Sequence, residues 1–364
     1  MTVWNSHTSV GNIVGKALSS FALGFSGGEA DLNNGNNWPA TFFVCGGLIS
    51  SMSVFVFCFL KNSPEDAGLQ KVVMESDTAL LKEGPDRENP LLDAGASKYG
   101  TTQSSGDTPK SKEATGILRA LAIPGVVEFA LSLFFCKFVA YTFIYWLPYY
   151  LGHVGFPAET AGYLSIFFDL GGIPGGVLAG VISDKVGDRG VVIFVYLALT
   201  IPSLYAYRAI TENLGDTAIA IHVILMLVLG ALVNGPYALI TTAVSADLGQ
   251  HQSLKGSKAL MATVAGIIDG TGSVGAAAQG LVIGALSSSC RGWDAVFSAL
   301  QFASAMSAIC LVRMLLADIG SEPSGRMSLH KISVYAAVLA LVGAAVYNVV
   351  TMVEDCGVQD TMCT

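Results

Sequence analysis

Long apolar segments recur along this chain of 364 residues, and they constrain its fold more than any other feature. A helix of roughly 20 apolar residues crosses a bilayer core, and nine segments have this character. They span residues 3–25, 39–60, 123–151, 160–182, 190–210, 217–246, 259–287, 294–317 and 332–353. The pattern predicts an all-α, polytopic membrane protein.

The composition excludes several classes of function. Apolar residues make up 52% of the chain and charged residues only 13%, which is too few charges to solvate the surface of a globular enzyme. No stripe of Lys and Arg suits nucleic acid. The histidines are scattered, and no Ser, Cys or carboxylate cluster has catalytic or metal-ligand spacing. We therefore predict no enzyme activity, no metal or other cofactor, and no nucleic-acid partner; the expected surroundings are the lipid bilayer.

One polar stretch divides the chain. Of its 19 basic and 27 acidic residues, 18 lie between Lys61 and Arg119, among many Ser, Thr, Gly and Pro residues. This composition is typical of a disordered linker. The expected organisation is two helices that end an N-terminal bundle (1–61), a cytosolic linker (62–118), a C-terminal bundle of six helices (119–318), and a cytosolic turn, extra membrane helix and tail (319–364).

The basic residues predict the orientation. If the linker is cytosolic, loops on its side contain fourteen Lys and Arg residues, and the opposite loops contain two, Arg208 and Arg291. Because positive charges favour cytosolic loops, we expect the loops at 27–37 and 152–160 to face the lumen or the cell exterior.

The most specific motif follows the fourth apolar segment. Residues 180–190 read GVISDKVGDRG. They resemble the loop signature of the major facilitator superfamily, G-x-x-x-D-[RK]-x-G-x-[RK]-[RK], except that Gly190 replaces a basic residue. The resemblance implies that Asp184, with Lys185 and Arg189, forms charge pairs that latch a cytosolic gate. An ordinary charged loop is the alternative.

Further short strings narrow the resemblance by their order and spacing. They are VWNSHTSVGN at 3–12, SPEDAGL at 63–69, YWLPYYL at 145–151, FDLGGIPGG at 168–176, NGPYALI at 234–240 and GIIDGTGSVG at 266–275. Together they resemble the organophosphate/phosphate antiporters, and most closely the eukaryotic sugar-phosphate exchangers. The resemblance implies a major facilitator fold of about twelve helices in two halves. The family's first four helices have no counterpart before Met1, so the chain looks truncated, with a partial N-half, a complete C-half and one extra C-terminal helix.

Lys137 is the strongest candidate for substrate binding. It lies in the middle of an apolar segment, where a stranded charge costs about 3 kcal/mol or more. Tyr141 and Tyr145 follow at intervals of about one turn, so one helical face offers an ammonium group and two hydroxyls to a phosphate. Alternatively, Lys137 snorkels to the interface or pairs with Asp169 or Asp269 for stability alone.

The two aspartates are candidates in their own right. Asp169 and Asp269 lie beside glycines inside apolar segments, so we expect both to face the interior of the bundle. They are either counter-charges to Lys137, proton-coupling groups, or acceptors of structural hydrogen bonds.

Three weaker candidates complete the site prediction. The resemblance places Thr8 where bacterial relatives have a histidine, and His7 is its neighbour; Lys16, on the same segment, receives no role. In a later segment, Gly235 and Pro236 mark a hinge of the kind that alternating access requires.

These observations predict a carrier that exchanges a sugar phosphate or similar organophosphate for inorganic phosphate by alternating access. The resemblance favours the endoplasmic reticulum, with the plasma membrane or another organelle as alternatives. Two other functions stay open: a truncated pseudo-carrier with a role in assembly or regulation, and a carrier for another organic anion. If the short chain transports by itself, a homodimer is expected.

Overall fold

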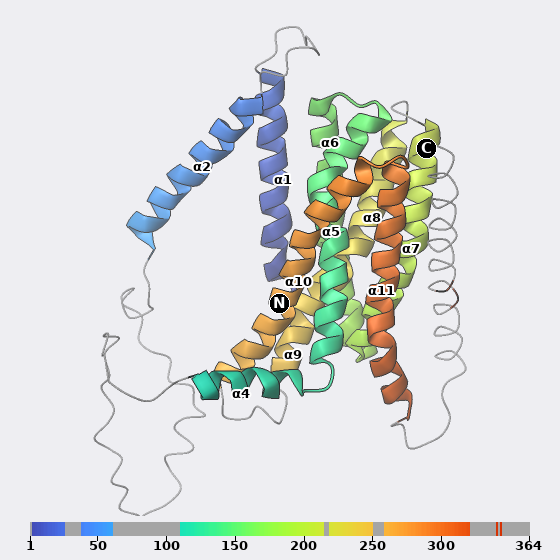
Figure 1. Cartoon of the computed structure of the whole chain (residues 1–364). Helices are drawn as coiled ribbons and strands as arrows, with labels where there is room; N and C mark the ends of the chain where they lie inside the picture. Colours follow the sequence, from blue (N-terminus) through green and yellow to red (C-terminus); the bar gives the residue numbers. More distant parts are fainter. Residues whose placement is uncertain are drawn as a thin grey trace, which may run out of the picture. The chain divides into compact units, whose positions relative to one another are not determined.

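The structure is a computed structural model that describes residues 2–25, 38–60, 110–214, 218–249 and 258–320, with Ala340 and Gly343. Every regular element in these ranges is helical (Figure 1). The elements are α1 (Thr2–Phe25), α2 (Trp38–Phe59), α4 (Lys110–Leu121), α5 (Val126–Val154), α6 (Ala158–Val186), α7 (Arg189–Leu214), α8 (Ile219–Leu239), the π-helical turn η1 (Ile240–Val244), α9 (Ser245–Gly249), α10 (Lys258–Ser287) and α11 (Trp293–Gly320).

Six helical segments in the described ranges are long and apolar enough to cross a membrane, namely α2, α5, α6, α7, the continuous run of α8, η1 and α9, and α11. The all-α, multi-pass architecture is thereby confirmed. Helices α1 and α10 are of similar length. Their mean hydropathy is lower because they contain many small residues and the charged residues Lys16 and Asp269. The predicted helix at 332–353 lies outside the described residues, apart from two positions.

One boundary differs from the expectation. Helix α4 begins at Lys110, within the range 62–118 that composition assigned to a disordered linker, whereas residues 61–109 lie outside the described ranges. Figure 1 shows α4 lying across the direction of the long helices. The sequence signal was weak because its apolar residues begin only at Ile117, and a short amphipathic helix has little apolar content.

The chain forms two compact units. The larger contains residues 1–45 and 112–364, and the smaller contains residues 46–111. Helices α1 and α5 to α11 belong to the larger unit, and it holds the candidate site.

Glycines set the spacing of α6 and α8 in the larger unit. A Cβ atom added at Gly175 would lie 2.3 Å from the Cα atom of Ala231, and one added at Gly171 would lie 2.1 Å from the carbonyl oxygen of Leu227. From the opposite helix, a Cβ at Gly230 would lie 2.0 Å from the Phe168 carbonyl oxygen. The two backbones are in direct contact, which small residues allow in membrane bundles.

Aromatic rings fill one end of the same bundle. Phe143 stacks on Phe168 with ring centres 4.9 Å apart, and the ring centres of Tyr150 and Phe297 are 5.0 Å apart. The hydroxyl groups of Tyr150 and Thr211 are 2.6 Å apart and hydrogen-bonded, which satisfies two buried polar groups. This core joins α5, α6, α7 and α11 and holds the helices that position the site.

We expect Gly175→Ala to destabilise the fold by about 1–3 kcal/mol, because the added methyl group meets backbone that cannot move aside. Gly280→Ala on α10 is the matched control, since its Cβ atom meets nothing within 4 Å. Thermal unfolding of the purified variants in detergent measures the difference. Equal unfolding temperatures would show that α6 and α8 are not in backbone contact.

Candidate functional site

Lys137 is buried on α5 beside α10. Its side chain is 5% exposed, and its Nζ atom donates a hydrogen bond of 2.8 Å to Oδ1 of Asp269. Longer bonds of 3.4 Å reach the Asp269 carbonyl oxygen and the Ser273 hydroxyl. The Tyr237 ring of α8 lies under the ammonium group, with its centre 5.8 Å from Nζ, a distance typical of a cation–π contact. The structure thus pairs Lys137 with one of the two aspartates proposed from the sequence.

Glycines of α10 create the room for this lysine. A Cβ atom at Gly272 would lie 2.7 Å from Cγ of Leu133 and 3.0 Å from Cδ of Lys137, and one at Gly275 would lie 2.1 Å from the Phe134 carbonyl oxygen. The segment GIIDGTGSVG therefore supplies the counter-ion Asp269 and the close approach that brings it to Lys137.

Asp169 has a different partner from the one expected. Its Oδ2 atom lies 2.6 Å from Nζ of Lys16, and its Oδ1 atom accepts a 3.0 Å hydrogen bond from Asn12. Lys16 also donates to the Ser165 carbonyl oxygen at 3.4 Å. Asp169 is therefore a counter-charge to Lys16 rather than to Lys137.

This second pair follows from the packing of α1 on α6. Gly162 of α6 faces Ser20 of α1 so closely that a Cβ atom there would lie 2.0 Å from the serine hydroxyl. The close approach brings Lys16, one turn before Ser20 on α1, to Asp169, about two turns after Gly162 on α6. Sequence reasoning assigned Lys16 no role, because which helix α1 contacts cannot be read from α1 alone.

The two ion pairs differ in burial. The Asp169 side chain is 2% exposed and that of Lys16 is 14% exposed, whereas the Asp269 side chain is 58% exposed. Both Asp169 oxygens accept hydrogen bonds from α1. Asp269 binds Lys137 through one carboxylate oxygen and is open to an approaching ligand, so the pair at Lys137 has the more accessible carboxylate.

The tyrosines of α5 form a row that winds around the helix. Tyr141, Tyr145, Tyr149 and His153 follow Lys137 at intervals of four residues. Because an α-helix has 3.6 residues per turn, each step turns by about 40°. Lys137 contacts α10, the Tyr141 ring lies 6.5 Å from that of Tyr237 on α8, and Tyr145 is 62% exposed. The row therefore winds slowly around α5, while the neighbouring rings of Tyr141 and Tyr145 stay close, with their centres 5.8 Å apart.

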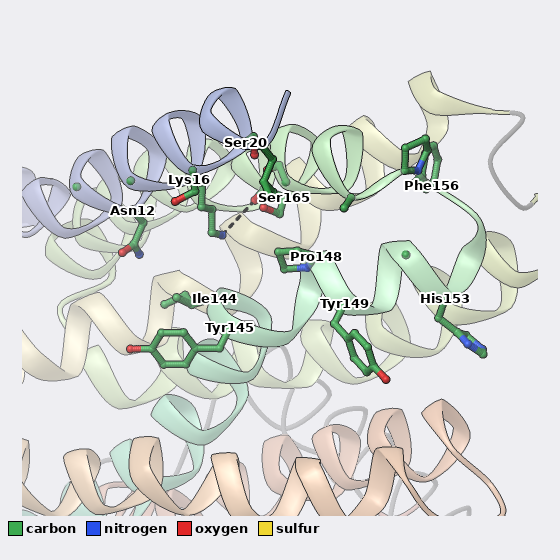
Figure 2. A pocket seen from close by; sticks show the side chains of 18 of the residues that line it. Asn12, Lys16, Ser20, Ile144, Tyr145, Pro148, Tyr149, His153, Phe156 and Ser165 are labelled. Carbon is green, nitrogen blue, oxygen red and sulfur yellow. Dashed lines mark hydrogen bonds between the residues drawn. The ribbon is translucent and has the colours of Figure 1, made fainter. Parts of the chain in front are cut away.

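The outer part of this row lines a large cavity. Its volume is about 910 Å³, and it lies between α1, α5, α6 and the start of α11 (Figure 2). Helix α1 contributes Asn12 and Lys16, whereas α5 contributes Tyr145 and Tyr149. Sequence reasoning stopped at Tyr145, although the four-residue spacing continues and could have pointed to the next tyrosine.

A small neighbouring cavity of about 30 Å³ connects the candidates on α1 to those on α5. Thr8 and Asn12 line it together with Tyr141, Asp169 and Tyr237. The predicted candidate Thr8 therefore lies near the tyrosines. Its neighbour His7 is exposed and does not line either cavity.

Charged residues cluster at the predicted gate loop. The Nε atom of Arg189 lies 2.5 Å from Oδ2 of Asp247, and its Nη1 atom lies 3.7 Å from Oδ1 of Asp184. Gly187 ends α6 with a φ of +77°, which a glycine adopts without strain. Lys185 is exposed. Sequence reasoning missed Asp247, since it lies far from the motif along the chain.

The predicted hinge lies before a break in helical geometry. Pro236 is inside α8, and η1 begins four residues later, at Ile240. The hydroxyl of Ser245 donates to the carbonyl oxygen of Ile240, five residues earlier, as in the wider π-helical turn. Such turns occur frequently at functional sites. Gly235 also has a packing role, because a Cβ atom there would lie 2.5 Å from Cε1 of Tyr196.

Comparison with known proteins agrees with this geometry. The family model of the Major Facilitator Superfamily matches residues 1–280. The chain belongs to the major facilitator superfamily. This facilitator is a multi-pass membrane protein and not an enzyme.

Its curated relatives come from plants and animals. A protein of Arabidopsis thaliana that is named as a glycerol-3-phosphate transporter is 42% identical over 328 residues, which cover 88% of this facilitator and 58% of that protein. A glucose-6-phosphate exchanger of Bos taurus is 40% identical over 324 residues, which cover 88% and 62%. The facilitator thus spans about three fifths of the length of these relatives and is related to organophosphate exchangers.

The difference in burial between the two ion pairs leads to a stability prediction. Asp169→Asn leaves the Lys16 charge without its partner, so we expect a loss of up to about 3 kcal/mol. Asp269→Asn also leaves Lys137 without its counter-charge, but we expect a smaller loss, because the pair is open on the side of Asp269, which is 58% exposed. Thermal unfolding of the purified variants compares the two.

The control for this comparison removes both charges of the buried pair. Lys16→Met combined with Asp169→Asn should recover part of the stability that Asp169→Asn loses. An Asp269→Asn variant that unfolds as early as Asp169→Asn would contradict the distinction between a closed and an open pair.

Proposed function

We propose that the facilitator exchanges a sugar phosphate or similar organophosphate for inorganic phosphate, with Lys137 binding the phosphate group. The observation that carries the proposal is the open ion pair between Lys137 and Asp269, with its 2.8 Å bond and a carboxylate that is 58% exposed. The printed names of the relatives, a glycerol-3-phosphate transporter and a glucose-6-phosphate exchanger, support this substrate class.

The bonds around Lys137 favour replacement of its partner by an anion. An ammonium group has three donors, and here only the bond to Asp269 is short, while the bonds to Ser273 and to the Asp269 carbonyl oxygen are 3.4 Å long. A phosphate has more charge and more acceptor atoms than a carboxylate. It can replace Asp269 without leaving the lysine unpaired in the low dielectric of the membrane.

The remaining elements fit a carrier that alternates between two open states. Arg189 joins the ends of α6, α7 and α9 through Asp184 and Asp247, and these exposed bonds can break and re-form as the ends separate. The irregular turn after Pro236 offers a place where α8 bends. We assign this charged end to the cytosol from the distribution of basic residues.

The same proposal covers organisation and location. Residues 1–61 would belong to an N-terminal bundle and residues 119–318 to a C-terminal bundle, with two bundles rocking about a midplane site. The resemblance to the eukaryotic sugar-phosphate exchangers favours the endoplasmic reticulum as the membrane. If the chain transports in this length, it would do so as a homodimer.

We expect Lys137→Ala to lower phosphate exchange by at least about tenfold, because a lost charge contact to phosphate is equivalent to more than about 1.4 kcal/mol. The assay loads proteoliposomes with unlabelled phosphate and follows the uptake of labelled phosphate. Arg119→Ala removes an exposed cation of α4 and should leave exchange unchanged. Absence of exchange by the unmodified protein, or full exchange by a well-folded Lys137→Ala variant, would contradict the proposal.

Neutralising the partner should have the opposite effect on affinity. Asp269→Asn removes the carboxylate that competes for Lys137, so the KM for phosphate should fall about three- to tenfold. Maximal exchange should also fall, since tighter binding of the substrate alone does not lower the barrier to its release. The control is Asp294→Asn, which removes a carboxylate paired with Arg208 on α7. A KM that rises in Asp269→Asn would show that Asp269 helps to bind phosphate instead of competing with it.

A further inference from the structure

We propose that the end of the large cavity near Asn12 and Tyr145, called its inner end below, binds a sugar ring, the uncharged, polyhydroxylated part of the substrate. Lys137 holds the phosphate. Tyr145 of α5 and Asn12 of α1 are the residues assigned to this sugar subsite. The inference rests on the proposed phosphate exchange and adds the element that distinguishes a sugar phosphate from inorganic phosphate.

The cavity has two chemically different walls. One side carries rings, Tyr145 and Tyr149 of α5 and Trp293 of α11. The facing side carries small polar groups of α1 and α6, among them Asn12 and Ser165 (Figure 2). A sugar ring has an apolar C–H face and a rim of hydroxyl groups. It matches these walls, because aromatic faces pack on apolar C–H surfaces while polar side chains bind hydroxyls.

The charge of the cavity favours an uncharged ligand group. Among the lining residues in the described part of the chain, Lys16 is the only lysine or arginine. Its ammonium group is neutralised by Asp169 at 2.6 Å, and Asn12 binds the other oxygen of the same carboxylate. A free anion would have to break this buried pair to bind here, whereas a hydroxyl group would not. The phosphate end of a substrate is better placed at Lys137.

The large cavity and the surroundings of Lys137 have a small cavity between them. Asn12 and Ile144 line both the large cavity and the small neighbouring one. Tyr141 and Tyr237 line the small cavity, and the ring of Tyr237 lies 5.8 Å from Nζ of Lys137. A ligand held by the ammonium group would enter the inner end of the large cavity by displacing the rings of Tyr141 and Tyr237, because the small cavity between them has a volume of only about 30 Å³.

The length of the path selects the residues that meet the sugar. Along α5, Tyr141 is about 6 Å, Tyr145 about 12 Å and Tyr149 about 18 Å beyond Lys137. In a hexose phosphate, one carbon and one oxygen separate the ring from the phosphorus, so the ring reaches the level of Tyr141 and Tyr145. Tyr149 and Trp293 line the cavity further along, beyond the reach of a ring held in this way.

Competition with phosphate exchange tests the subsite. We expect glucose 6-phosphate to compete with labelled phosphate about tenfold less well in Tyr145→Ala than in the unmodified protein, because the packing surface for the ring is lost. The KM for inorganic phosphate should rise much less than this, since inorganic phosphate has no ring to pack against Tyr145. Tyr205→Ala is the matched control, because Tyr205 is similarly exposed on α7 at 61% and lies outside the cavity. Unchanged competition, or an equal loss for both ligands in a folded variant, would overturn the inference.

A binding measurement separates this inference from the exchange activity. Ligands that bind the folded state raise its unfolding temperature. At equal concentration, glucose 6-phosphate should stabilise the purified protein more than inorganic phosphate does. This difference should disappear in Tyr145→Ala and persist in Tyr205→Ala. If it is present while exchange is absent, the exchange proposal fails and the subsite stands; if it persists in Tyr145→Ala, the subsite is wrong.

Discussion

A charge inside a membrane must have a partner, and this requirement shapes the larger unit of the structure. Lys16 and Lys137, which lie in the middle of long helices, each contact an aspartate of a neighbouring helix. The cost of an unpaired charge in the bilayer makes each contact specific. One pair joins α1 to α6 and the other joins α5 to α10, and glycines bring the helices close enough for both.

The two ion pairs have different roles: one stabilises helix packing, and the other can exchange its carboxylate for a ligand. Asp169 has both carboxylate oxygens bound and is closed to solvent, so its pair with Lys16 stabilises the packing of α1. The carboxylate of Asp269 is open on one side, which makes its pair with Lys137 exchangeable. Under the proposed function, the closed pair keeps the cavity wall neutral and the open pair provides the phosphate contact.

The sequence predicted the helices well, because the length of each apolar segment corresponds to the length of a helix that crosses the bilayer. The predicted start of the segment at 190–210 and the observed start of α7 at Arg189 differ by one residue. The ion-pair partners were less predictable from the sequence, since they depend on which helices are neighbours and on how each helix is rotated about its axis. For that reason Lys16 was left without a role, Asp169 was considered as a partner of Lys137, and Asp247 was missed. Composition also missed the start of α4, because a short surface helix has no long apolar run.

The spiral of residues on α5 has a stereochemical consequence. Lys137 and the tyrosines that follow it turn in one sense around the helix, by about 40° for each step along the row. A set of groups arranged in this way has no mirror symmetry. A substrate that extends along the row meets each group from a different direction, so its D and L forms would present their hydroxyls differently to the same side chains. The spacing of four residues thus places these groups along a helical path, and a chiral substrate that follows it would meet them in a fixed angular order.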